Sequence, residues 1–288
     1  MLQVDAPARS LMRDEPAFST LGFWERLSFR VMRFFNQGGG SKVAWIWQRW
    51  VITPLVGQIV SRRLRIRGLE RLDRVPADAP ILLVANHRTF FDLFILGRIL
   101  IRHPRLCRRV NFPVRSNFFY EGLPGLLVAT IFTGGTMFPP FFRSATKKGM
   151  NRLSLRILVD KLRTPGQLVG FHPEGTRNKT DDPYVLLPAQ PGAGELALKA
   201  RPVVIPAFIL GLSNSPWAEL RANLRGERPV IAVFGEPMEL PPLVEETRLS
   251  HHKKFADVLN ARITELGAEE RAIRTAASPP LSPASRAT

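Results

Sequence analysis

Residues 80–101, PILLVANHRTFFDLFILGRILI, contain the transition that decides the fold. The first six residues are apolar without alternation, which is typical of a strand buried on both faces of a sheet. The residues after position 92 are apolar at helical spacing, and a polar turn separates the two runs. A strand, a turn and a helix in this order form the repeating unit of α/β folds.

The same alternation continues along the chain from residue 64. Short apolar runs predict strands at Leu64–Gly68, Ile81–Ala85, Val110–Val114, Gln167–Phe171, Val203–Leu210 and Val230–Phe234. Longer periodic segments predict helices at Phe90–Arg102, Thr146–Arg163, Gly194–Lys199 and Val244–Leu266. We therefore expect an α/β fold with a mixed, partly parallel central sheet flanked by helices.

Two segments before residue 64 predict N-terminal membrane-associating helices. Phe23–Phe35 is expected to be a helix with two different faces. The apolar face is formed by Phe23, Leu27, Val31 and Phe34, and the basic face by Arg26, Arg30 and Arg33. Such a helix either lies in a lipid interface or packs as an ordinary surface helix. Val43–Val60 has three tryptophans, but its central Arg49 would cost about 2.5–3.5 kcal/mol inside a bilayer. This second segment predicts a monotopic hairpin or an interfacial segment rather than a span.

A third long uncharged segment, Gly122–Pro140, contains seven Gly and Pro residues, which favour a buried helix–turn–strand structure. Together these features divide the chain into four parts. They are a polar segment (1–20), the membrane-associating helices (21–63), an α/β domain (64–267) and a disordered tail (268–288) rich in Pro, Ser and Ala at its end. The first twenty residues lack the apolar core of a secretory signal.

Charge indicates the class of partner. The 288 residues carry a formal net charge of +17, with 33 Arg and 8 Lys. This excess favours a polyanion, namely nucleic acid, an anionic membrane surface or a phosphorylated substrate. Residues 98–177 alone contain 14 Lys and Arg against 3 Asp and Glu. A basic nucleic-acid-binding protein is the non-enzymatic alternative, although the sequence has no helix-turn-helix, RNP or zinc-finger motif.

The turn after the strand at 81–85 holds the first candidate site. Thr89 is expected to be the N-cap of the next helix, with Asp92 at the third helical position as in a capping box. These two residues alone would only start a helix. His87 precedes the cap, and a turn there would let the Asp92 carboxylate reach one imidazole nitrogen. A His–Asp pair without a neighbouring Ser or Cys nucleophile describes a general base that acts on a substrate hydroxyl.

The second candidate site, FHPEGTRN at 171–178, also follows an apolar strand. Gly175 allows close backbone approach, Thr176 offers a hydroxyl and Arg177 offers a fork of donors for phosphate or carboxylate. The alternative is an acidic turn that closes a strand. The chain has no G-x-S-x-G and no P-loop, and its single cysteine, Cys107, makes no metal cluster. We therefore expect no serine hydrolase, no nucleotide-binding loop and no metal site.

The order and spacing of these motifs resemble those of the glycerolipid acyltransferases. NHRTFFD at 86–92 is similar to the N-H-x4-D motif of that family, PEGTR at 173–177 to its second hallmark, and RPVVIP at 201–206 to its third. The resemblance covers about Arg65 to Leu240 and is strongest to the 1-acylglycerol-3-phosphate (lysophosphatidic acid) acyltransferase branch. Two positions depart from the family pattern, since Thr89 stands where Ser is common and His172 where Phe is usual.

This resemblance implies an enzyme that moves a fatty acyl group from an acyl-thioester to a hydroxyl of lysophosphatidic acid or a similar lysophospholipid. Glycerol 3-phosphate and a lyso-aminolipid are alternative acceptors. The resemblance makes His87 the general base and Asp92 its orienting carboxylate. The residues implied to hold the glycerol phosphate are Arg143, Glu174, Gly175, Thr176 and Arg177.

The resemblance also implies the partners of the enzyme. The donor would be acyl-CoA or acyl-carrier protein as a co-substrate, with no further cofactor and no nucleic acid. Because these donors are cytosolic, we expect peripheral or monotopic attachment to membrane lipids at the cytoplasmic face.

Overall fold

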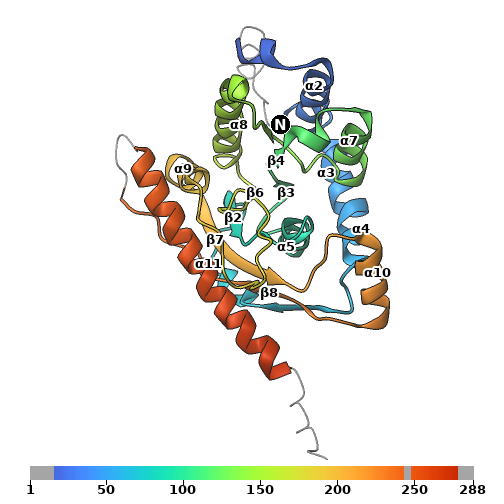
Figure 1. The fold of residues 1–288 in the computed structure, drawn as a ribbon, viewed down its shortest axis with the longest axis vertical. Coiled ribbons are helices and arrows are strands. Elements are labelled where there is room, and N and C mark those ends of the chain that lie inside the picture. Colours follow the sequence, from blue (N-terminus) through green and yellow to red (C-terminus); the bar gives the residue numbers. More distant parts are fainter. Residues whose placement is uncertain (1–15, 243–247, 278–288) are drawn as a thin grey trace, which may run out of the picture.

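A six-stranded sheet in the order β1-β8-β7-β2-β6-β3 forms the centre of the computed structural model, which describes residues 16–242 and 248–277 (Figure 1). Its strands are β1 (Leu64–Arg67), β2 (Ile81–Ala85), β3 (Arg109–Asn111), β6 (Gln167–Phe171), β7 (Val203–Leu210) and β8 (Val230–Phe234). Only the β7–β8 pair is antiparallel. The expected mixed, partly parallel α/β sheet is therefore confirmed, and most of its strand pairs are parallel.

Helices cover both faces of this sheet. One face packs against α4 (Thr53–Gln58) and α5 (Asp92–Ile101), and the other against α8 (Lys148–Lys161), α9 (Pro191–Ala200) and α11 (Leu249–Ala277). Successive residues of β2 belong to different cores, with Leu83 on the α5 side and Leu82 on the α9 side. This two-sided burial explains why the strand is apolar without alternation.

The N-terminal helices pack on the α/β domain. They comprise η1 (Pro16–Thr20), α2 (Phe23–Gln37), α3 (Ser41–Trp47), the π-helical turn η2 (Gln48–Ile52) and α4. The chain is helical from α3 through α4, so the expected hairpin within 43–60 is wrong. Pro54 lies in the first turn of α4, directly after the π-helical turn η2, and the chain stays helical across it. Ile52 and Val56 lie in the main core, while Trp50 and Leu55 are exposed.

The segment between β3 and α8 carries a small second sheet and short helices. It contains β4 (Val114–Arg115), α6 (Ser116–Phe119), α7 (Leu123–Leu127), η4 (Val128–Phe132), β5 (Pro140–Phe141) and η5 (Ala145–Lys147). The expected helix–turn–strand order is present, but its helical part is not fully buried, because Leu123, Leu127 and Phe132 are exposed. Within the described residues, no helix combines the length and the apolar character needed to cross a bilayer.

Helices α5, α10 and α11 differ from the expected helices. Helix α5 begins at Asp92 with Phe91 as its N-cap, so Thr89 lies in the preceding turn. Helix α10 (Pro216–Arg225) was not predicted, although the Ser215 cap, Pro216 in the first turn and Gly226 after the end are its signals. Helix α11 continues ten residues past the expected domain end at 267, where buried Glu270 accepts hydrogen bonds from Arg274 and Tyr184.

Some predicted segments fall outside the described residues. They are positions 1–15 of the polar segment, positions 243–247 near the expected start of the last helix, and positions 278–288 of the expected tail.

Candidate active site

The parallel register of the sheet brings the two sequence motifs together. Val84 of β2 is paired with Phe171 of β6, so the loops that follow these strands leave the sheet side by side. The carboxyl edge of a parallel sheet is the usual place for a ligand site in open α/β folds. Two hydrogen bonds link the loops. The His87 N–H donates to the side-chain Oε1 of Glu174 at 2.7 Å, and the Asn178 N–H donates to the His87 backbone carbonyl at 2.7 Å.

Asn86, the first residue of the NHRTFFD motif, has a structural role. Its side-chain amide donates to the Ile209 carbonyl at 2.9 Å, and its Oδ1 accepts from the Ile209 N–H at 2.8 Å. Asn86 is buried and attaches the start of the motif to β7. The loop that carries His87 is therefore held between β6 and β7.

His87 and Asp92 face each other across the turn before α5. The His87 Nδ1 lies 3.5 Å from Asp92 Oδ2. The same carboxylate accepts the Arg88 and Thr89 backbone N–H groups at 2.7 Å each, and its Oδ1 accepts the Thr89 hydroxyl at 2.5 Å. Because Asp92 is buried and held by these three bonds, its position is fixed independently of the imidazole. His87 Nε2 remains as the nitrogen that is available to a substrate.

The surroundings of the pair keep His87 uncharged. Burial and the nearby Arg177 and Arg115 cations lower the pKa of His87 to about 4. Burial raises the pKa of Asp92, and hydrogen bonds from Thr89 and Arg88 oppose this effect. A neutral imidazole at pH 7 is able to accept a proton, as a general base must.

His172, directly after β6, stacks on His87. The two ring centroids lie 3.7 Å apart and the planes are inclined by only 6°. Burial lowers the pKa of His172 to about 3, and His87 adds to the effect. Ligand atoms of His87, Asp92 and His172 lie within 4.8 Å of one another, which is close enough to consider a metal ion. The lone pairs of parallel rings do not converge on one ion, so the arrangement of these three described residues does not fit a tetrahedral site.

Glu174, which the resemblance implies as a ligand for glycerol phosphate, has a carboxylate whose hydrogen-bond partners lie within the protein. It is buried, and both carboxylate oxygens accept backbone N–H groups, from His87 at 2.7 Å and from Leu187 at 2.8 Å. Burial raises its pKa, and the hydrogen bonds from Leu187 and His87 oppose this. Its contacts are those of a clamp between two loops.

Two arginines, Arg115 and Arg177, lie near the pair, and Arg143 lies near Arg115. Arg115 donates to the Gly175 carbonyl at 2.8 Å, and Arg177 donates to Asn214 Oδ1 at 3.1 Å. Burial, followed by repulsion from Arg143 and Arg177, lowers the pKa of Arg115. Mutual repulsion of this kind means that the three cations share one local field, which favours an anionic ligand. Arg143, Gly175, Thr176 and Arg177 are exposed, and Gly175 has a left-handed backbone with φ 65°.

Sequence reasoning missed two of these neighbours. Arg115 is the last residue of β4 and lies outside any motif, and Asn214 follows β7. The side-chain Oδ1 of Asn214 also accepts the Phe90 N–H at 3.0 Å, so this residue joins the His87 loop to Arg177. No motif marks Asn214 in the sequence. The parallel pairing of β7 with β2 places the loop after β7, which carries Asn214, at the same sheet edge.

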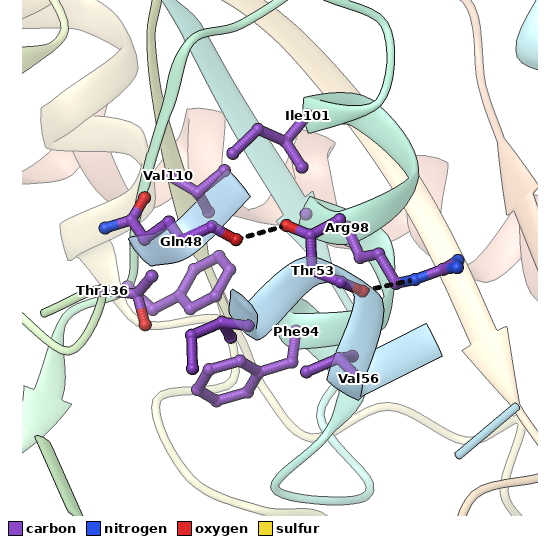
Figure 2. A pocket seen from close by; sticks show the side chains of 11 residues that line it. Gln48, Thr53, Val56, Phe94, Arg98, Ile101, Val110 and Thr136 are labelled. Atoms are coloured by element: carbon purple, nitrogen blue, oxygen red, sulfur yellow. Dashed lines mark hydrogen bonds between the residues drawn. The ribbon is translucent and has the colours of Figure 1, made fainter. Parts of the chain in front are cut away.

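A small recess of about 30 Å³ lies apart from this cluster, between the N-terminal helices and α5. Figure 2 shows the residues that line the recess, among them the apolar side chains of Phe94 and Val110. It also shows two hydrogen bonds between lining residues. Thr53 donates to the Gln48 carbonyl at 2.7 Å, and Arg98 donates to the Thr53 carbonyl at 2.9 Å. Gln48 Oε1 has no hydrogen-bond partner among the described residues. The seam between the N-terminal helices and the sheet is therefore incompletely filled.

The chain belongs to the acyltransferase family, whose pattern matches residues 63–210. This is the glycerolipid acyltransferase family that includes the lysophosphatidic acid acyltransferases. The matched region begins just before β1, ends with β7 and includes both loops described above. A search of curated proteins found no match. The protein is therefore an acyltransferase.

Proposed function

We propose that this protein is a membrane-bound O-acyltransferase that moves a fatty acyl group from acyl-CoA or acyl-carrier protein to lysophosphatidic acid or a similar lysophospholipid. The observation that carries this proposal is the pairing of a neutral His87 with buried Asp92 beside Arg115 and Arg177, with Arg143 near Arg115. The pair supplies a base for a hydroxyl, and the arginines supply donors for a phosphate on the same acceptor.

The proposed reaction needs no covalent enzyme intermediate. The acceptor hydroxyl attacks the thioester carbonyl while His87 Nε2 removes its proton, and a C–O bond forms. The tetrahedral oxyanion then collapses, the C–S bond breaks, and the proton passes from His87 to the departing thiolate. Asp92 stabilises the imidazolium that exists between these two steps. An anionic acceptor bound at Arg115 and Arg177 would offset their charge and raise the pKa of His87, which strengthens the base.

Aromatic side chains near the site support a lipid acceptor. Exposed Phe118 contacts Phe119, with ring centroids 4.9 Å apart, and Phe119 stacks on Phe90 at 5.9 Å. Phe90 lies three residues after His87 in the same loop. This run of rings gives an acyl chain an apolar route along the protein surface to the proposed base.

The acceptor proposal predicts a selective effect of Arg177→Gln. We expect the KM for a phosphate-bearing acceptor to rise about 10–100-fold, because a charge-assisted contact of about 1.5–3 kcal/mol is lost. The KM for the acyl donor should change little. Steady-state kinetics with each substrate varied in turn measures both values, and Arg152→Gln, an exposed position on α8, is the matched control. An equal rise for an acceptor without phosphate would contradict the assignment.

An acceptor panel with one labelled donor tests the proposed function as a whole. Lysophosphatidic acid is expected to be the best acceptor, followed by other lysophospholipids. Preference for glycerol 3-phosphate or a lyso-aminolipid would replace the proposed acceptor but keep the reaction type. Failure of every acceptor with both acyl-CoA and acyl-carrier protein would contradict the function.

Membrane attachment is supported by an apolar surface, here called the N-terminal apolar face. Its members are all exposed and belong to the N-terminal helices or to the α6–η4 segment: Phe23, Phe34, Val43, Ile46, Trp50, Leu55, Phe118, Leu123, Leu127, Ile131 and Phe132. Trp47 donates to the Ile131 carbonyl at 2.7 Å and joins the two parts, and α7 lies beside α3 in Figure 1. Amphipathic helices with aromatic and basic side chains bind lipid interfaces.

Loss of an exposed tryptophan should weaken this attachment. Trp50 is 65% exposed, and Arg49 lies over its ring at 5.7 Å. We expect Trp50→Ser to reduce binding to phosphatidylglycerol-containing vesicles about tenfold, because apolar area is removed from the interface. Vesicle co-sedimentation measures the change. Trp217→Ser on α10, where the side chain is 79% exposed, is the matched control and should bind as the wild type does. Equal losses in both variants would count against the N-terminal apolar face.

A further inference from the structure

His172 is hydrogen-bonded to β2, the strand that leads to His87. Its Nδ1 lies 3.0 Å from the Ala85 carbonyl oxygen on β2, and a carbonyl only accepts, so Nδ1 carries the proton in this contact. Ala85 is two residues before His87. The ring of His172 is thus fixed relative to the backbone of the proposed base, and it lies flat against the imidazole at 3.7 Å.

We propose that His172 is a positioning residue whose ring face holds the His87 imidazole in the plane where Nδ1 meets Asp92 and Nε2 meets the substrates. This inference rests on the proposed role of His87 as general base. It assigns His172 no contact with a substrate and no proton transfer of its own.

The contact with Asp92 does not orient His87 by itself. The Nδ1–Oδ2 distance of 3.5 Å is longer than a normal N–H···O bond, and the outer torsion of a histidine side chain has a broad preference. The His87 side chain is also 21% exposed, so water competes for its nitrogens. A flat, anchored ring on one face removes the rotations that would take the imidazole out of line with the carboxylate.

The same contact suits the charged form of the base. When His87 accepts a proton, the face of a neutral ring lies against the new cation, which is a favourable arrangement. The charged groups around His87 are Asp92 on α5, Glu174 and Arg177 after β6, and Arg115 at the end of β4. A neutral ring orients the imidazole without adding a charge to this set.

Four variants of the full-length chain test the proposal. His172→Phe keeps a flat ring, His172→Leu removes it, and His172→Asn removes the ring but keeps an N–H donor for Ala85. His252→Leu, a buried position on α11, is the control for loss of an imidazole. We expect His172→Leu and His172→Asn to lower kcat about 10–100-fold with little change in KM, because misplacement of a reacting group acts on the chemical step. His172→Phe should stay within about threefold of the wild type.

Histidine NMR supplies a readout that does not depend on turnover. The His87 signal, assigned by its loss in His87→Ala, should titrate near pH 4 in the wild type and in His172→Phe. In the Leu and Asn variants it should titrate closer to 6.5, the ordinary pKa of histidine, because a ring that rotates into water loses the desolvation that lowers its pKa. An enzyme without acyl transfer would refute the proposed function but leave this titration measurable. The inference is overturned if folded Leu and Asn variants keep the wild-type kcat and titration, or if His172→Phe falls as far as they do.

Discussion

Replacement of His87 by alanine should abolish measurable acyl transfer while leaving the fold intact. A positioned general base contributes about 10²–10⁴-fold to the rate, so kcat should fall by that factor. The backbone bonds of this residue to Glu174 and Asn178 do not involve its side chain and remain in the variant. Release of CoA from a labelled donor measures the rate, and circular dichroism and the melting temperature report the fold.

A second histidine provides the control for this experiment. His103 is exposed, beyond the end of α5, and His103→Ala should retain full activity. Turnover by folded His87→Ala at the wild-type rate would remove His87 from the mechanism. Vesicle binding should be unchanged in both variants, because neither position lies on the N-terminal apolar face.

The pH profile gives an independent view of the same base. His87 acts when neutral, and its pKa in the free enzyme is lowered to about 4, so kcat/KM should fall on the acid side only near that pH. In the complex, an acceptor phosphate offsets Arg115 and Arg177, so the acid limb of kcat should lie at a higher pH than that of kcat/KM. An acid limb of kcat/KM near the ordinary histidine pKa would contradict this assignment.

Asp92→Asn should have the second largest effect and should separate activity from stability. With the amide oriented so that its oxygen replaces Oδ2, the Arg88 and Thr89 backbone N–H groups keep an acceptor, and the Thr89 hydroxyl can rotate to accept from the new NH2 group. The cost in stability should then be about 1 kcal/mol. The charge that stabilises the His87 imidazolium is lost, so kcat should fall about 10²–10⁴-fold.

Two further variants complete this test. Asp92→Ala leaves the two backbone N–H groups buried without an acceptor, so it should lose roughly 1–3 kcal/mol per orphaned group and unfold at a clearly lower temperature. Asp73→Asn, at a position whose side chain is 82% exposed, should behave as the wild type. Denaturant melts and kcat measured on the same preparations check both quantities. A fully active Asp92→Asn would show that the carboxylate only caps α5.

The local sequence determined the elements and the candidate motifs. Unbroken apolar runs identify strands that are buried on both faces, and such runs depend only on neighbouring residues, so β2, β6, β7 and β8 were predictable within a residue or two. The same holds for the loops at 86–92 and 171–178, because each follows directly on a strand. Helix ends were less predictable. The start of α5 at Asp92 depends on the whole turn, since the carboxylate there accepts bonds from residues before the helix.

The burial of α2 shows how packing overrides an amphipathic pattern. The expected apolar face of Phe23 and Phe34 is exposed, and the helix instead buries Phe29 and Met32. Asn36, also buried, donates to the Gly135 carbonyl at 2.8 Å. Helix α2 therefore has two apolar faces. The face with Phe29 and Met32 is buried because it packs against residues in the segment 120–157.

By itself, the sequence determined an α/β domain with a His–Asp turn and a PEGTR loop, because periodicity and motif spacing are local properties. The resemblance of these motifs to a known family implied an acyltransferase. The tertiary structure alone decided that Glu174 clamps the His87 loop, that His172 stacks on His87, and that Arg115 and Asn214 join the site. The physical reason is the register of distant strands. Parallel pairing of β2 with β6 and β7 determines which loops meet at the sheet edge, and that pairing depends on how whole elements pack.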